Sequence, residues 1–439
     1  MGRGAVHMRS VPARKKQFII NSIFAEQAPA KFLFGKLWRQ AASTLLVGTA
    51  VLGSALAQPK TAVHRCVEEG KTENYDLAIR HCTAALALKQ ISEDDRRIIL
   101  YMLGTSYYLK GIPDKAIQHL SLLLKISPND VDARFTRASS YSGLKDYDKA
   151  IDDYNRVLRS NPKAKLALQN RGLAYAGKKQ YERAIQDYDQ ALRIDSTDAE
   201  LYQNRGIAHV ESKAYDRGIK DLNEAIRLNP NLVEAYANRG YAYFNKKDYD
   251  RAIADYNKAL ELAPASALVY NKRGKAFINK KDFKRAIEDF DKAINLDPSY
   301  AAAYANRGSL YAGLQKLDLA SRDLNKSLQL DPNYPYAYTM RAFVFSMKKE
   351  FDRAMQDHNQ ALRLAPSSEF AYYGRGVTYL DMRQYEKAIK DFDEALRIDP
   401  SFIPANEMRQ LAVQRTQVQN QEKEIERLKD KVKSRVKDR

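Results

Sequence analysis

Pairs of arginine and aspartate recur along most of this chain, and such side chains can form ion pairs or hold a charged ligand. Eight arginines are spaced 34 residues apart: Arg137, Arg171, Arg205, Arg239, Arg273, Arg307, Arg341 and Arg375. Each is followed sixteen residues later by an aspartate: Asp153, Asp187, Asp221, Asp255, Asp289, Asp323, Asp357 and Asp391. One period of 34 residues before Arg137 and Asp153, Leu103 and His119 stand in place of the arginine and the aspartate. Joint presence and joint loss favour a structural ladder of pairs, because a partly buried charge needs a partner. The alternative is a cationic stripe for nucleic acid or acidic ligands.

No residue pattern typical of an active site accompanies these pairs. The sequence has no glycine-rich phosphate loop, no Cys/His nucleophile pair and no cluster of metal ligands. Adjacent acids such as Asp152 and Asp153 recur with the same period and indicate solvated helix faces. We therefore expect no catalytic residues, no cofactor and no metal.

The elements that position the pairs are delimited by prolines. Eight of them, with Ser196 in one vacant place, follow a step of 34 residues: Pro128, Pro162, Pro230, Pro264, Pro298, Pro332, Pro366 and Pro400. Numbering each unit from 31 residues before its proline gives nine repeats: 97–130, 131–164, 165–198, 199–232, 233–266, 267–300, 301–334, 335–368 and 369–402. A fixed period of this length predicts an array of stacked units.

Each unit reads as two short amphipathic helices. In the unit 233–266, Tyr236, Gly240 and Tyr243 share one face of a first helix. Ala252, Tyr256 and Ala259 recur on one face of a second helix, which Pro264 ends. With the turn near position 15 or 16, positions 7 and 23 lie at about the same height, which suits the arginine and aspartate. Because neither helix buries its apolar face alone, we predict an all-α solenoid.

The spacing of aromatic, glycine, alanine and proline positions resembles the tetratricopeptide repeat family over residues 97–402, about 70% of the chain. The resemblance implies a right-handed superhelix of about nine to ten helix pairs. It also implies a concave groove that binds peptides or proteins, lined by positions 2, 5, 6, 9, 12 and 13 of each first helix. The family usually has an apolar residue at position 7, so the arginines depart from its pattern.

Both cysteines lie before the regular array, in a degenerate unit that we expect over residues 58–96 as an N-terminal cap. Cys66 and Cys82 fit positions 8 and 24 of that unit, which lie symmetrically about its turn. We predict that they form a disulfide if the chain is exported, since oxidising compartments favour one; two buried thiols are the alternative. Four extra residues are expected around Lys89–Asp95.

Two kinds of side chain stand at the expected groove positions. Asparagines resemble those that, in long superhelices of this family, bond a bound peptide backbone: Asn170, Asn204, Asn238, Asn306 and, one place earlier in its unit, Asn271. The alternative is a habit of these repeats without a ligand. Aromatic candidates for anchoring apolar ligand side chains lie towards both ends: Tyr101, Tyr108, Phe135, Tyr336, Phe343, Phe370 and Tyr373. Packing between repeats is the alternative for these rings. No unit combines Lys at position 5 with Asn at position 9, which disfavours recognition of an acidic C-terminus by the family's carboxylate clamp.

The two ends of the chain carry most of its net charge of +19: residues 1–40 contribute +7 and residues 403–439 contribute +4. Within the leader, AASTLLVGTAVLGSALAQ at 41–58 is apolar, follows Lys36 and Arg39, and ends in an Ala-x-Ala pattern. We predict that residues 1–57 are a secretory leader cleaved after Ala57, although the basic stretch before it is long. A mitochondrial presequence is the alternative.

The segment 403–439 follows the last repeat as a capping helix and charged tail. Leu411, Val418, Ile425 and Val432 are seven residues apart, and Leu428 adds part of a second stripe. One heptad position with mostly polar partners does not predict a stable dimer without help, so the oligomeric state stays open.

These features predict a non-enzymatic scaffold that binds a protein or an extended peptide in the concave groove, in the periplasm or secreted. An intracellular or mitochondrial adaptor with the same mechanism is the alternative. A basic nucleic-acid-binding solenoid is a third reading, disfavoured because the extra charge lies mainly at the ends. No transmembrane segment is expected after cleavage of the leader.

Overall fold

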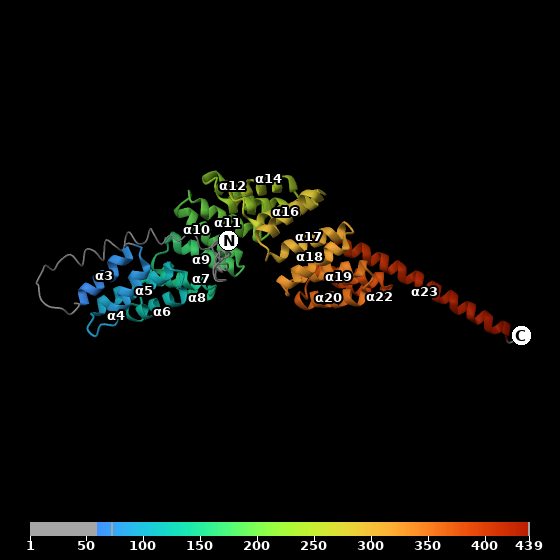
Figure 1. Ribbon diagram of the computed structural model, residues 1–439, viewed down its shortest axis with the longest axis horizontal. Helices are drawn as coiled ribbons and strands as arrows, with labels where there is room; N and C mark the ends of the chain where they lie inside the picture. Colours follow the sequence, from blue (N-terminus) through green and yellow to red (C-terminus); the bar gives the residue numbers. More distant parts are fainter. Residues whose placement is uncertain (1–58, 72, 438–439) are drawn as a thin grey trace, which may run out of the picture. The chain divides into compact units, whose positions relative to one another are not determined.

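The computed structural model describes residues 59–71 and 73–437, and within these ranges the chain forms 21 helices and no strand. The predicted leader and its cleavage site lie outside the described residues. No helix among the described residues is long and apolar enough to cross a membrane. The fold is therefore the predicted all-α solenoid, built from consecutive antiparallel helix pairs that stack on one another (Figure 1).

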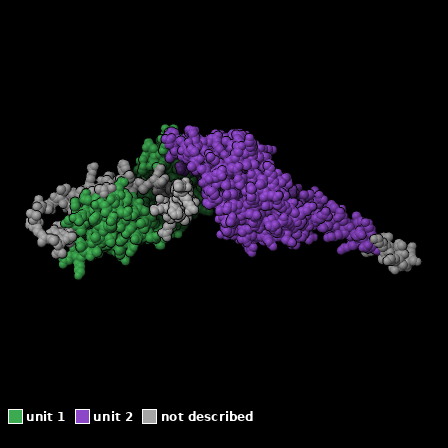
Figure 2. Space-filling model, viewed as in Figure 1, with its two compact units in different colours: residues 1–229 green, residues 230–439 purple. Residues whose placement is uncertain are grey.

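The chain divides into two compact units, Met1–Asn229 and Pro230–Arg439, which Figure 2 shows in separate colours. The described helices of the first unit are α3 (Pro59–Lys71), α4 (Tyr75–Leu86), α5 (Glu93–Leu109), α6 (Pro113–Ile126), α7 (Val131–Gly143), α8 (Tyr147–Ser160), α9 (Lys165–Gly177), α10 (Tyr181–Ile194), α11 (Ala199–Glu211) and α12 (Tyr215–Leu228). In each pair the odd-numbered helix is the first, or A, helix and the even-numbered one is the second, or B, helix.

The second unit continues the same pattern. Its helices are α13 (Val233–Asn245), α14 (Tyr249–Leu262), α15 (Ala267–Asn279), α16 (Phe283–Leu296), α17 (Ala301–Gly313), α18 (Leu317–Leu330), α19 (Pro335–Met347), α20 (Phe351–Leu364), α21 (Glu369–Asp381), α22 (Tyr385–Ile398) and α23 (Ile403–Lys437). Each pair from α7–α8 to α21–α22 falls inside one of the predicted 34-residue repeats.

Local sequence fixes where the helices of a repeat begin and turn. Asp248 caps α14 by accepting a hydrogen bond from the backbone N–H of Arg251 at 3.2 Å, and Asp282 caps α16 in the same way through Arg285. Between the helices, position 15 adopts the left-handed conformation in every repeat. It is glycine only at Gly111 and is otherwise a long polar residue, such as Lys281 with φ of 59°. At each non-glycine residue this conformation costs roughly 1–2 kcal/mol, because Cβ lies close to the following carbonyl oxygen.

The four extra residues before the regular array lengthen a helix. The A helices from α7 to α21 have 13 residues, whereas α5 has 17 and begins at Glu93, capped by Ser92. Its first turn therefore carries the insertion that the sequence places around Lys89–Asp95.

Helix α23 begins as the A helix of an additional repeat. Ala405 and Ala412 are buried against α22, in the same core cluster as Phe392. Where a B helix would begin, α23 continues as one helix to Lys437, and Gln410, at the position that contacts the B helix in the repeats, is exposed. Farther along, Val418, Ile425 and Leu428 are about half exposed. The first turns of α23 thus cover the last repeat.

Candidate functional site

The eight arginine–aspartate pairs lie inside the helix pairs, between position 7 of the A helix and position 23 of the B helix. In each, arginine Nε donates to one carboxylate oxygen and Nη2 to the other, at 2.6–2.9 Å. The aspartate side chains are 2–10% exposed and those of the arginines 14–21%. The bidentate geometry of partly buried partners fixes the height of one helix against the other.

The third guanidinium nitrogen joins successive repeats, which the sequence reading missed. Nη1 of Arg171 donates to Asn155 Oδ1 at 2.7 Å, and Nη1 of Arg205 donates to Asp189 Oδ1 at 2.6 Å. Position 25 of the preceding repeat also accepts at Ser121, Asn257, Asp291, Asn325 and Asn359. Even α23 follows the pattern, since Arg409 Nε donates to Asp393 at 2.5 Å. Each such arginine therefore sets the stacking of repeats as well as the pairing of helices.

The surroundings of the pairs make them structural. The guanidinium of each ladder arginine also lies over an aromatic ring of its own A helix, as Arg273 does over Tyr270 at 5.4 Å and Phe277 at 5.8 Å. Hydrogen bonds to Asp187 raise the pKa of Arg171. Burial raises the pKa of Asp187, against the lowering effect of Arg171. The carboxylate therefore depends on its arginine, and loss of that arginine would leave a buried charge without compensation.

Glycine and an aromatic or leucine side chain make the neighbouring contact, between positions 8 and 24. A Cβ atom on Gly274 would lie 2.7 Å from Phe290, and one on Gly376 would lie 2.6 Å from Phe392. Phe290 and Phe392 are fully buried. A larger residue at position 8 would displace this ring, so glycine here allows the helices to approach.

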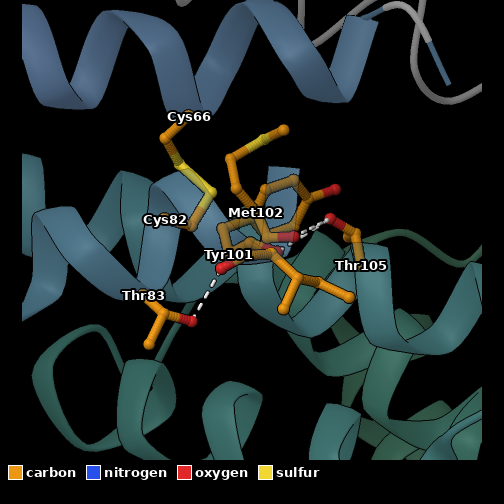
Figure 3. The surroundings of a disulfide bond; sticks show 7 residues. Cys66, Cys82, Thr83, Tyr101, Met102 and Thr105 are labelled. Carbon is orange, nitrogen blue, oxygen red and sulfur yellow. Dashed lines mark hydrogen bonds between the residues drawn. A yellow bond between two sulfur atoms is a disulfide. The ribbon is translucent and has the colours of Figure 1, made fainter. Parts of the chain in front are cut away.

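In the α3–α4 pair, a covalent bond takes the place of this contact. Cys66 and Cys82 stand at the equivalent positions and form a disulfide, with their Cα atoms 4.6 Å apart (Figure 3). Val63 of α3 and Met102 and Leu103 of α5 belong to the same buried cluster as the disulfide. His64 and His81, beside the cysteines in sequence, join no group of metal ligands among the described residues. The disulfide thus fastens α3 and α4 to each other.

The α5–α6 pair replaces the ion pair by an aromatic stack. His119, at position 23, lies parallel to the Tyr107 ring with centroids 5.5 Å apart, and Lys115 lies over the same ring. Leu103, at position 7, is fully buried in the core next to the disulfide. The joint loss of arginine and aspartate here leaves neither charge unpaired.

The A helices line the inner side of each unit. Neighbouring A helices contact one another, as α5 does α7 and α17 does α19, whereas neighbouring B helices make no comparable contacts among the described residues. A stack whose A helices lie closer together curves towards them. We call positions 2, 5, 6, 9, 12 and 13 of the A helices the inner face.

The five candidate asparagines have different surroundings. Asn271 is buried, and its amide bonds Tyr300 Oη at 3.3 Å and Asn306 Nδ2 at 2.9 Å. Asn238 Nδ2 donates to the Glu234 carbonyl at 2.8 Å. Asn170 and Asn204 are half-buried. Asn238 and Asn306 therefore use their Nδ2 groups as donors within the protein, whereas the Asn271 amide is used there through both its nitrogen and its oxygen.

The candidate aromatic residues all contact the core as well as the inner face. Tyr101, Tyr108 and Phe135 pack against buried clusters in the first unit. In the second unit Phe370 stacks on Tyr336, with centroids 6.1 Å apart, and lies 6.2 Å from Phe343. Tyr373 contacts Phe392 and Phe402. The Tyr336, Phe343 and Phe370 side chains form one continuous half-buried patch on α19 and α21.

A histidine occupies position 24 in the repeat 335–368. His358 is fully buried, its Nε2 lies 2.9 Å from Thr378 Oγ1, and Phe343 meets it edge-on. Its Nδ1 atom is buried without a hydrogen-bond partner among the described residues. Burial, with a smaller contribution from Arg375, lowers the pKa of His358 to about 3. The ring is therefore neutral at ordinary pH.

Comparison with known families matches most of the array. Models of the tetratricopeptide repeat match residues 233–266, 370–402, 68–131, 135–199 and 301–334, and a model described as TPR repeat matches 208–247 and 274–315. Together these matches span more than half of the chain. No curated protein matches it.

Three of the solved structures that the chain resembles are as follows. A tetratricopeptide repeat protein from Parabacteroides merdae is 24% identical, with 57% of this chain and 97% of that chain covered and a TM-score of 0.48. The Cut9–Hcn1 hetero-tetramer of the APC/C is 13% identical, with 82% and 97% covered and a TM-score of 0.45. Yeast Tom70 is 16% identical, with 82% and 96% covered and a TM-score of 0.43.

Proposed function

Because this chain belongs to the tetratricopeptide repeat family, we propose that it is a non-enzymatic scaffold that binds an extended peptide or protein segment along the inner face of its A helices. The family and fold fit protein–protein interaction in general. The observation that carries the proposal is a difference between two sets of positions in the repeat. Positions 7, 8, 23 and 24 repeat with little change and are used in packing, whereas inner-face positions differ from repeat to repeat.

The inner face offers the chemistry that an extended chain requires. Amide oxygens of Asn238 and Asn306 can accept backbone N–H groups, which suits a main chain of any sequence. The Tyr336, Phe343 and Phe370 patch offers half-buried rings for apolar side chains. Peptide contact by these residues is part of the proposal.

The binding proposal can be tested by photo-cross-linking. A benzoylphenylalanine placed at Ile207 or Ser309, both at position 9, should cross-link to added extended peptides. The same group at the exposed B-helix residues Lys220 or Lys292 should cross-link far less. Equal yields at all four positions, mapped by mass spectrometry, would show that the inner face is not the binding surface.

We further propose that this scaffold acts in the periplasm. The apolar segment at 41–58 and the Ala55–Ala57 pattern support export, and a buried disulfide suits an oxidising compartment. Intact-mass measurement of the protein from a fractionated host should find a chain starting at Gln58, two hydrogens lighter before reduction than after it. A cytosolic chain that keeps its leader, with free thiols, would favour the intracellular adaptor instead.

A further inference from the structure

One segment of the inner face carries cations held over aromatic rings. Lys272 and Lys275 of α15 occupy positions 6 and 9. The Nζ atom of Lys272 lies 5.0 Å from the centroid of Tyr241, and that of Lys275 lies 5.5 Å from the centroid of Phe244. Both rings belong to α13, the A helix of the preceding repeat. In the nine repeats, lysine occurs at positions 6 and 9 only in this helix.

The Lys275 ammonium group differs from the ladder arginines in its surroundings. Among the described residues, no carboxylate oxygen lies within ion-pair distance of its Nζ, in contrast to the buried ladder arginines. Neighbouring protein atoms remove part of its water, and this burial lowers the pKa of Lys275. Its side chain nevertheless keeps an exposed surface. A partly desolvated cation with one open side favours an incoming anion.

We propose that Lys272 and Lys275 form a subsite for a carboxylate side chain of an acidic extended peptide, which specifies the ligand class of the proposed function and rests on it. The neighbouring repeats fit such a ligand. Asn238 and Asn306 stand at position 6 on either side of Lys272, and each amide oxygen is left to serve as an acceptor while Nδ2 donates within the protein. A peptide crossing α13, α15 and α17 can therefore donate backbone N–H groups to the asparagines while it presents an acid to the lysines.

The rings favour a peptide over a nucleic acid. A base would need an open ring face for stacking, but Tyr241 and Phe244 each have an ammonium group over one face. Phe244 also meets Tyr249 edge-on, with centroids 5.6 Å apart. The inner-face acid of these helices, Glu234, precedes Tyr241 by seven residues, roughly 10 Å along the helix. Lysines therefore outnumber acids at the inner-face positions of α13, α15 and α17.

The test uses the full chain and three fluorescent probes in an anisotropy titration. The probes are a twelve-residue extended peptide with alternating Asp and Glu, the same peptide with Asn and Gln in their place, and a single-stranded oligonucleotide. The variants are K272Q/K275Q and a charge-matched control, K284Q/K292Q, which changes two exposed lysines of α16 in the same repeat. We expect the acidic peptide to bind the native chain at least about tenfold more tightly than its amide counterpart.

The K272Q/K275Q variant should lose this preference, and the K284Q/K292Q variant should keep it. Loss of preference in both variants would reduce the effect to net charge and would overturn the subsite. Tighter binding of the oligonucleotide than of the acidic peptide, abolished by K272Q/K275Q, would overturn it in favour of nucleic acid. If both peptides bind equally and cross-link at position 9, the scaffold proposal stands and the acidic subsite is wrong.

Discussion

The contacts between the two helices of a repeat and the inner face differ in how much they vary. Residues sixteen apart, at positions 7–23 and 8–24, contact each other through an ion pair, through an aromatic or leucine side chain packed on a small residue, or through a disulfide. Position 9 of the inner face instead holds Ser139, Leu173, Ile207, Tyr241, Lys275, Ser309, Phe343 and Val377 in successive repeats. The difference indicates that the repeated positions between the helices stabilise the fold, whereas the varied positions of the inner face are available for recognition. We call the contacts at positions 7–23 and 8–24 the helix seam.

The largest effect is expected from breaking one arginine–aspartate pair in the seam. The R273L variant should lose about 3–5 kcal/mol of unfolding free energy, because the Asp289 side chain, 6% exposed, would stay charged without its partner. Denaturant unfolding followed by helical circular dichroism measures this loss. The R273L/D289L variant should recover most of it, since leucines leave no buried charge. A loss below about 1 kcal/mol in R273L would mean that the pair is merely a surface ion pair.

The second effect concerns the seam of the N-terminal pair. The C66S/C82S variant should lose about 3 kcal/mol of local stability, because the disulfide closes a loop with a sequence separation of 16 residues. Hydrogen exchange should quicken in α3 and α4 and stay unchanged in α15 and α16, since repeats interact mainly with their neighbours. Unchanged exchange in α4 would show that packing alone holds the cap.

The third prediction concerns His358, a seam residue whose contribution to the unfolding free energy should depend on pH. Burial holds the folded-state pKa of His358 at about 3, below its usual 6.5, so the unfolded chain takes up a proton that the folded chain does not. Stability from this site is full above about pH 6.5 and falls as the pH drops towards 3. The H358F variant, which copies Phe392 of the next repeat, should gain on the order of 2 kcal/mol at pH 5.

The gain in H358F should fade near pH 7.5, apart from any change in packing. The H64Q variant, at an exposed histidine of α3, serves as the control. Parallel pH profiles of unfolding for H358F and the native chain would contradict a buried neutral histidine.

The smallest effect on stability is expected on the inner face. The K275Q variant should change the unfolding free energy by less than about 0.5 kcal/mol, because the lysine has an exposed surface and no carboxylate partner among the described residues. Denaturant midpoints under identical conditions provide the measurement. A loss of several kcal/mol would assign Lys275 to the seam rather than to recognition.

The seam could be predicted from the sequence because its chemistry is local to one repeat. Arg273 and Asp289 share a helix pair, so spacing alone indicates their contact, and the same holds for Cys66 and Cys82. Contacts between repeats depend on how the pairs stack. For this reason the bond from Arg273 Nη1 to Asn257 and the burial of Asn271 under Tyr300 were not predicted.

The two lysines of the Lys272–Lys275 segment are visible in the sequence, but the search for repeated residues did not single them out. These lysines are the exception at their positions, whereas a search for repeated residues looks for what the units share. Rings at inner-face positions could not be divided into anchors and packing residues either, because Phe343 and Tyr373 contact both the core and the inner face.

The most direct test compares stability and binding in one variant from each region. The K272Q/K275Q chain should lose about tenfold in affinity for the acidic peptide while its denaturant midpoint stays unchanged. The C66S/C82S chain should lose protection in α4 while its affinity stays unchanged. That crossed pattern is what the separation of helix seam and inner face predicts. A fall in stability and affinity together in either variant would contradict it.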